Sequence, residues 1–339
     1  MDVVGIIPVM LGFHPAESVV LLGLDGPQRR ACLTMRADLP QPSDSAAALS
    51  AALADRLRRT GAASAVGAVF ASAPPSVRTG PGGESGNRAR DLPYASFAAQ
   101  LTRDLEAAGT PFLNVFLVSG QRIWSYGCRD PRCCPAEGTP VPESLTPAAA
   151  RLRAEMVGRG RRVLSSRDEL VDSVAPPSAE RRQALEPVFA AVSDDLLARL
   201  TAVGVEAVRQ ETVSVARRLH AQYVRGDTTL AAGDAARLSL GLADVLARDD
   251  VLQWGGGADS AALTALLLDV AGHALPPDDG PVCVALAWTA YQDGNGALAQ
   301  CALDRALASD PESTLGQLLQ HALEMALPPD RLAGARRDG

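Results

Sequence analysis

Residues Ser18–Leu24 have the sequence SVVLLGL, a continuous apolar run, and a turn at Asp25–Pro27 separates them from the alternating segment Ala31–Ala37 (ACLTMRA). An apolar run bounded by turn residues is typical of a buried strand, and period-two alternation is typical of a half-buried one. The two segments therefore predict a β-hairpin, which places the beginning of the chain in a sheet.

Helical and strand patterns alternate after this hairpin. In the first helical segment leucines recur every four residues and a glycine follows, which is the spacing and the stop signal of an amphipathic helix. The predicted elements are a helix at Ser43–Arg59, a strand at Ala65–Ala71, a helix at Tyr94–Ala108, and strands at Phe112–Ser119 and Arg122–Gly127. The order β-β-α-β-α-β-β predicts an α/β domain over residues 1–142, with a mixed sheet and flanking helices.

Two loops stand out within this domain. Residues 72–91 are rich in proline, glycine, serine and arginine. Such a segment has little apolar surface to offset the entropy of ordering the chain, so we expect it to be disordered. Residues 128–140 form a second loop, which contains three of the six cysteines of the chain.

Strand signals stop after Pro140, and the remainder of the chain is predicted to be helical. Thr146–Pro147 is a typical helix start, because proline suits the first helical position. Amphipathic segments follow at Ser178–Val203, Val205–Val224, Asp234–Leu252 and Ala258–Ala271. We therefore expect a helical region over residues 143–254 and a second helical region over residues 255–339.

The last region has the pattern of a tetratricopeptide repeat, in which small residues occupy the positions where two helices cross closely. When Pro311 is aligned with the proline near the end of the repeat, alanines fall on all three small positions. These alanines are Ala287, Ala299 and Ala306. A single unit of this kind predicts a tetratricopeptide-like helical hairpin at Val282–Ser309 rather than an extended solenoid.

Composition excludes some classes of function. The formal net charge is −7, and all 32 basic residues are arginines. Nucleic-acid-binding surfaces are normally basic, so nucleic-acid binding is not expected. The apolar start of the chain is interrupted by Pro8 and His14, far short of the ~20 residues that span a bilayer, and it lacks the basic beginning of a secretory signal. We expect a cytoplasmic protein with reduced thiols and no membrane contact.

Two motifs differ from ordinary composition: Leu11–Pro15 (LGFHP) and Cys128–Pro140 (CRDPRCCPAEGTP). Together with Trp124 before the cysteine motif, Arg36–Pro40 (RADLP) and the pattern over Gly294–Pro311, they closely resemble an actinobacterial family catalogued as domain of unknown function number 4192. The resemblance covers nearly the whole chain. Such proteins usually have a further segment before this point, so the N-terminal strand is expected to be either missing or mis-started here. The resemblance implies no activity, substrate or cofactor.

The cysteine motif is the best candidate for chemistry. Cys128, Cys133 and Cys134 lie within seven residues, and thiolates favour zinc or iron–sulfur clusters. A tetrahedral zinc site needs four ligands, and His14 or Cys32 is the candidate for the fourth. The alternatives are a tight structural turn with partly buried thiols and a redox pair, which requires a lowered thiol pKa.

The motif residue His14 is also a candidate general base, with Glu17 as the group that orients it. The alternative is a turn at the start of a strand in which the imidazole is hydrogen-bonded locally. Overall, we expect a non-enzymatic interaction or regulatory protein. The second hypothesis is a metal- or thiol-dependent enzyme centred on His14 and the cysteine loop.

A protein partner is expected to bind the helical half. Trp288 and Tyr291 lie in the predicted hairpin. If exposed, they would suit an interface, where aromatic residues are favoured anchors. The alternative is that both rings are buried between helices.

Overall fold

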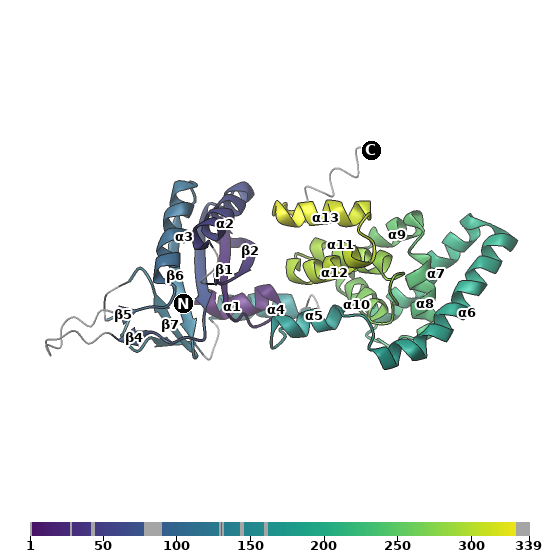
Figure 1. The fold of residues 1–339 in the computed structure, drawn as a ribbon, viewed down its shortest axis with the longest axis horizontal. Helices are drawn as coiled ribbons and strands as arrows, with labels where there is room; N and C mark the ends of the chain where they lie inside the picture. The colour runs from purple at the N-terminus through teal and green to yellow at the C-terminus, as the bar shows by residue number, and fades with distance from the viewer. Residues whose placement is uncertain are drawn as a thin grey trace. The chain divides into compact units, whose positions relative to one another are not determined.

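The computed structural model describes residues 2–27, 29–41, 45–77, 90–128, 130, 132–142, 146–158 and 162–329. The chain forms two compact units, Met1–Ser166 and Arg167–Gly339 (Figure 1). The first unit contains a mixed sheet with flanking helices, and the second is entirely helical in its described part. The predicted fold class is therefore confirmed. The predicted boundaries at residues 142 and 254 stay predictions.

The sheet of the first unit has six strands in the order β2-β1-β3-β6-β7-β8. Its strands are β1 (Ser18–Asp25), β2 (Arg30–Asp38), β3 (Ser64–Phe70), β6 (Phe112–Ser119), β7 (Arg122–Ser125) and β8 (Thr139–Pro140). Only β3 and β6 are parallel, and every other neighbouring pair is antiparallel. Because β3 and β6 are parallel and adjacent, their carboxyl ends meet at one edge of the sheet.

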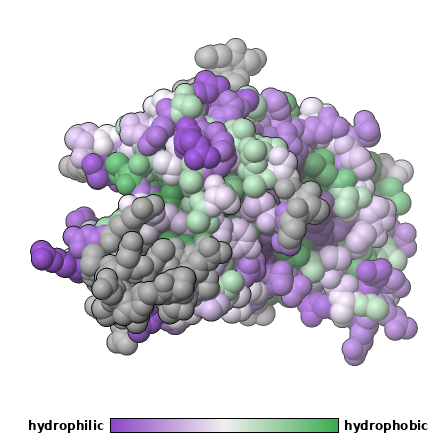
Figure 2. All heavy atoms as spheres, turned by 60° about the vertical axis from the view of Figure 1, so that its left-hand side comes forward, coloured by the Kyte–Doolittle hydropathy of each residue, from purple (hydrophilic) through white to green (hydrophobic). Residues whose placement is uncertain are grey.

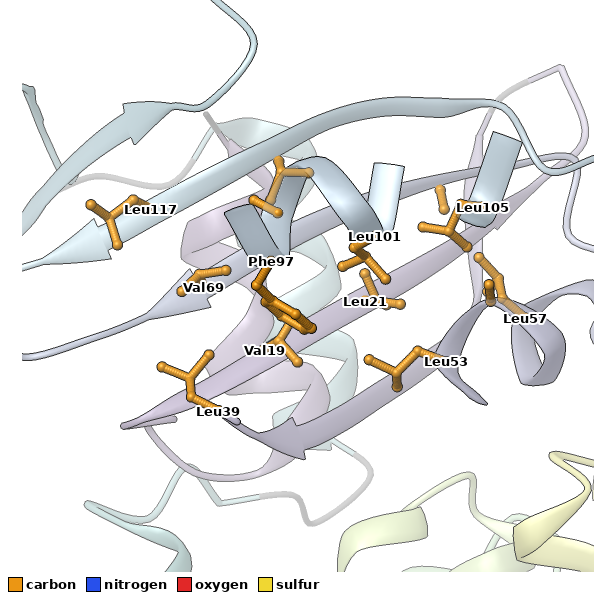
Figure 3. Packing of buried hydrophobic residues seen from close by; sticks show 14 of the residues in the cluster. Val19, Leu21, Leu39, Leu53, Leu57, Val69, Phe97, Leu101, Leu105 and Leu117 are labelled. Carbon is orange, nitrogen blue, oxygen red and sulfur yellow. The ribbon is translucent and has the colours of Figure 1, made fainter. Parts of the chain in front are cut away.

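Helices α2 (Ala46–Thr60) and α3 (Ala95–Ala107) pack on one face of this sheet. The main core lies between them and the strands, and Figure 3 shows its leucines, valines and phenylalanine pointing toward one another. Ser45 caps α2 by accepting a hydrogen bond from the N–H of Ala48 at 3.2 Å. Gly61 ends the helix in the left-handed conformation, at φ 71°. The leucine stripe and the glycine stop of α2 therefore act as the sequence predicted, whereas the cap at Ser45 was not predicted.

The chain begins with helix α1 (Asp2–Leu11), which the sequence analysis did not predict. Pro8 inside the helix and its apolar character on all sides remove the usual periodic signal. Helix α1 packs against α4 (Pro147–Gly158). A β-bridge between Phe13 and Leu164 joins the two segments that follow these helices. The helix after Thr146, which was predicted to belong to the helical half, thus lies in the first unit.

The predicted disordered loop at residues 72–91 falls mostly outside the described residues, which resume at residue 90 after a gap of 78–89. The flanking residues form a short antiparallel ladder between β4 (Ser76–Val77) and β5 (Arg90–Asp91). The disorder of the central part stays a prediction.

The second unit contains nine described helices. They are α5 (Arg167–Val174), α6 (Ala179–Val203), α7 (Val205–Val224), α8 (Ala232–Gly241), α9 (Val245–Leu252), α10 (Ser260–Ala271), α11 (Gly280–Gln292), α12 (Gly296–Ser309) and α13 (Thr314–Glu324). The single helix predicted at 234–252 is wrong, because the chain breaks between α8 and α9. Asp244 caps α9 there by accepting hydrogen bonds from the N–H groups of Leu246 and Ala247.

Helices α11 and α12 form the predicted helical hairpin, with Ala287, Ala299 and Ala306 buried where the helices meet. Trp288 and Tyr291 are 6% and 4% exposed. The Tyr291 hydroxyl donates a hydrogen bond to the carbonyl of Leu327 at 2.6 Å. Both rings therefore belong to the helix packing, and the hypothesis that they are exposed interface anchors is wrong.

In the described part of the chain, no helix is long and apolar enough to cross a membrane. On the face shown in Figure 2, hydrophobic residues are interspersed among hydrophilic ones.

Candidate functional site

Three cysteines of the 128–140 loop meet in space. The sulfur atoms of Cys128 and Cys133 are 3.0 Å apart, and those of Cys133 and Cys134 are 3.8 Å apart. All three sulfurs lie within 4.8 Å of one another. Around a tetrahedral zinc ion with bonds of about 2.3 Å, neighbouring sulfurs are about 3.8 Å apart. The Cys133–Cys134 spacing therefore matches one edge of a zinc tetrahedron, and the Cys128–Cys133 spacing is shorter than such an edge.

A tight turn brings the adjacent cysteines back toward Cys128. The carbonyl of Asp130 accepts hydrogen bonds from the N–H groups of Cys133 at 3.3 Å and Cys134 at 2.8 Å. The N–H of Cys128 donates to the hydroxyl of Ser125 at the end of β7. These hydrogen bonds thus hold the turn in which the three sulfurs meet.

Two side chains of β7 fasten the second half of the loop to the sheet. The indole N–H of Trp124 donates to the carbonyl of Ala136 at 3.1 Å. The Arg122 guanidinium donates to the carbonyls of Glu137 and Gly138. Gly138 has φ 78°, and a Cβ atom there would lie 2.4 Å from the Trp124 ring. A glycine is therefore required against this tryptophan.

The hydrogen bonds within the cluster separate the three thiol pKa values. Hydrogen bonds from the thiols of Cys133 and Cys134 stabilise the Cys128 thiolate and lower the pKa of Cys128. The hydrogen bond to Cys128 raises the pKa of Cys133. Burial, with the neighbouring sulfurs, raises the pKa of Cys134 to about 12. Cys128 is thus the first thiol of the cluster to ionise.

The two residues proposed as a fourth ligand lie elsewhere in the first unit. Cys32 is exposed on β2. His14 lines a cleft with Ser119 and Gln121, at the Arg122 end of β7, whereas Cys128 follows the opposite end of that strand. Within the described ranges, the group of possible metal ligands at the loop consists of the three cysteines. The structure thus groups three of the four predicted ligands.

The predicted pair of His14 and Glu17 is also not joined directly. The Glu17 carboxylate accepts a hydrogen bond from the N–H of Ser72 at 2.6 Å. Among the described residues, no hydrogen bond connects the His14 ring to Glu17. A role for this pair in catalysis stays a prediction.

Sequence reasoning missed the residues that support the loop, Arg122 and Trp124. Trp124 is part of the motif on which the family resemblance rests, and this resemblance was the signal that pointed to Trp124. For Arg122 no comparable signal exists, because its acceptors are backbone carbonyls 15 and 16 residues away.

Comparison with known proteins supports the resemblance to this family. A family model described as Domain of unknown function (DUF4192) matches residues 1–330. No curated protein and no solved structure gives a significant match. Because the family model covers nearly the whole chain, including both motifs, this chain belongs to the DUF4192 family.

Proposed function

We propose that this protein is a non-enzymatic regulatory protein whose cysteine loop binds one zinc ion through Cys128, Cys133 and Cys134. The observation that carries the proposal is the meeting of three thiol sulfurs within 4.8 Å. Thiolates are soft ligands that favour zinc among the common divalent ions of cells. The proposal places the protein in the cytoplasm, where thiols remain reduced.

Three features favour a regulatory rather than a purely structural ion. Cys133 is exposed, and Cys128 and Cys134 are only partly buried. Three protein ligands leave one tetrahedral position for water or for a group from another molecule. The carbonyl of Asp130 accepts hydrogen bonds from the N–H groups of Cys133 and Cys134, which hold the loop in place. An exposed, incomplete and preformed site suits reversible binding.

The alternative is a metal- or thiol-dependent enzyme centred on both His14 and the cysteine loop. It has less support, because His14 does not belong to the three-cysteine group in the described part of the chain. A redox pair is better supported, since the sulfurs of Cys128 and Cys133 are 3.0 Å apart and the pKa of Cys128 is lowered.

Protein purified under reducing conditions is expected to contain about one zinc ion per chain, measured by elemental analysis. Cys133→Ser should lose most of the ion during purification, because it leaves only two thiol ligands. Cys301→Ser, at a partly buried cysteine of the second unit, is the matched control and should keep it. His14→Gln and Cys32→Ser should also keep it, since neither residue joins the cluster.

A metal-free protein that does not take up added zinc would contradict the proposal. If mass spectrometry of that protein also found a disulfide between Cys128 and Cys133, the redox pair would replace it. Loss of zinc in His14→Gln, without unfolding, would instead restore His14 as a ligand and favour the enzyme.

We also propose that the second unit binds a protein partner at the junction of α6 and α7. Four aliphatic side chains are exposed there, with exposed fractions between 38% and 60%. They are Leu197, Leu200, Val203 and Val205. Because burying exposed apolar surface favours association, this junction is a suitable contact.

A photo-crosslinking amino acid at position 197 is expected to give an adduct with another polypeptide in an extract of the native host. Position 157, where Val157 is 56% exposed in the first unit, is the control. No adduct at position 197, or the same adduct from both positions, would contradict the partner site.

A further inference from the structure

A cleft of about 550 Å³ lies at the edge of the sheet where the carboxyl ends of β3 and β6 meet. Phe70 and Ala71 line it from the end of β3, and Val118 and Ser119 line it from the end of β6. In α/β proteins, ligands bind outside the carboxyl ends of parallel strands, because the connecting loops leave a crevice there. The position of this cleft in the sheet is therefore typical of a ligand site.

Elements that are distant in sequence build the other walls. Helix α1 contributes Val4 and Pro8, and α4, which packs against α1, contributes Arg153 (Figure 1). The LGFHP motif ends in this wall, with His14 and Pro15 lining the cleft. The last two residues of the LGFHP motif thus lie in the wall of the cleft.

The rim of the cleft is built from backbone in an uncommon conformation. Glu17, Gly120 and Gln121 have φ values of 41°, 54° and 65°, in the left-handed region. For residues other than glycine this conformation costs on the order of 1 kcal/mol, and such residues concentrate at functional sites. Two hydrogen bonds hold Glu17 there, from the N–H of Ser72 to its carboxylate and from the N–H of Leu39 to its carbonyl.

The lining combines an apolar surface with two side chains that donate hydrogen bonds. Pro8, Phe70 and Val118 provide the apolar surface. Arg153 and His14 are exposed to the cleft. Among the described residues, Arg153 forms no ion pair and the His14 ring has no hydrogen-bond partner. Both donors are therefore available to a ligand.

We propose that this cleft binds a small organic anion, with a carboxylate or phosphate group on an apolar body. The planar guanidinium of Arg153 binds the oxyanion with two parallel hydrogen bonds, which is the geometry that both groups favour. His14 donates a further hydrogen bond, and the apolar body lies against Phe70 and Val118. The Glu17 carboxylate accepts a hydrogen bond from the Ser72 N–H. Because its negative charge repels a second anionic group, the cleft favours ligands that carry one carboxylate or phosphate group.

Benzoate and phenyl phosphate are suitable probes, with benzamide as a neutral control of nearly the same shape as benzoate. Ligands of this size are expected to bind with a Kd on the order of 1 mM. The readout is the Hε1 proton resonance of His14, assigned through His14→Gln. The chain has four histidines, and His220, His273 and His321 in the second unit serve as internal references.

One or both anions should shift the His14 resonance in a saturable manner, while benzamide and the three references show no change. Comparison of benzoate with phenyl phosphate identifies which oxyanion the cleft prefers. Arg153→Gln should weaken binding at least about tenfold, because it removes the charged fork. Arg151→Gln, at an exposed arginine of the same helix outside the cleft, should leave binding unchanged.

The proposal is wrong if neither anion shifts the His14 resonance, if benzamide shifts it as strongly as benzoate, or if Arg153→Gln binds as well as the unaltered protein. The zinc ion of the cysteine loop has no part in this measurement, so the result is independent of the proposed metal site.

Discussion

Replacement of Arg305 by methionine is expected to lower the free energy of unfolding of the second unit by about 3–5 kcal/mol. Arg305 lies on α12, and its side chain is 9% exposed. Its Nε donates a hydrogen bond at 2.8 Å to the carboxylate of Asp279, which is 1% exposed. Removing the cation leaves this carboxylate buried without its partner, which is the costly way to break an ion pair.

The other donors of Arg305 hold the ends of two helices. They bind the carbonyls of Val174, Ala271 and Ala274, at distances of 2.8–3.0 Å. Val174 is the last residue of α5, and Ala271 is the last residue of α10. Carbonyls at a helix end have no partner within the helix and carry its negative dipole, so a cation is favourable there. Methionine fills a similar volume but satisfies none of these acceptors.

Urea unfolding, followed by circular dichroism, measures this change in free energy. Arg218→Met is the matched control, because Arg218 forms an ion pair with Asp234 while its side chain is 53% exposed. An exposed pair of this kind contributes at most about 1 kcal/mol. If the free energies of unfolding of Arg305→Met and the control differ by less than about 1 kcal/mol, the buried pair does not stabilise the second unit.

A second substitution separates the contribution of the ion pair to stability from the contribution of side-chain packing. Asp279→Leu in the Arg305→Met background removes the unpaired carboxylate, so the double variant should recover part of the lost stability. Ser309, which donates a hydrogen bond to the same carboxylate, loses its acceptor in that variant and limits the recovery. No recovery at all would attribute the loss to packing and to the three carbonyls left without a donor, not to the ion pair.

Local patterns in the sequence were enough to predict the strands and most helices. The apolar run at 18–24 became β1, and the leucine stripe and glycine stop of 43–59 became α2, because each depends on residues a few positions apart. Helix α1 was missed because Pro8 and its uniformly apolar residues conceal the helical period. The break between α8 and α9 was missed because the hydrophobic pattern of a helix continues through it. The capping hydrogen bonds of Asp244, which mark the break, are not visible in that pattern.

Long-range contacts explain what the sequence did not predict about the candidate sites. The three cysteines were predictable as a group because seven residues contain all of them. Their separation from His14 depends on the direction of β7 in the sheet, which no spacing reveals. The cleft combines α1, β3, β6 and α4, and the role of Arg305 requires acceptors up to 131 residues away. Such arrangements appear only when the fold is known.

The zinc affinity of the cysteine loop is expected to increase about 100- to 1,000-fold for each unit of pH in the range where its thiols are protonated. Zinc binds thiolates, so each thiol that is protonated in the free protein must release a proton on binding. The raised pKa values of Cys133 and Cys134, the latter about 12, keep both protonated at neutral pH. These two thiols alone make the affinity rise about 100-fold per pH unit.

The pKa of Cys128 sets the pH at which the slope of log affinity against pH changes. This pKa is lowered from its ordinary value. Below that pKa all three thiols release protons, and the logarithm of the affinity should rise by about 3 per pH unit; above it the rise should be about 2. Competition with a chromophoric chelator between pH 6 and 9, corrected for the chelator's own protonation, measures both slopes.

Cys128→Ser should bind zinc more weakly, with a slope of about 2 throughout, because the residue that ionises first is absent. A slope of 1 or less in the unaltered protein would mean that Cys133 and Cys134 are not both zinc ligands, and the three-thiolate site would be wrong.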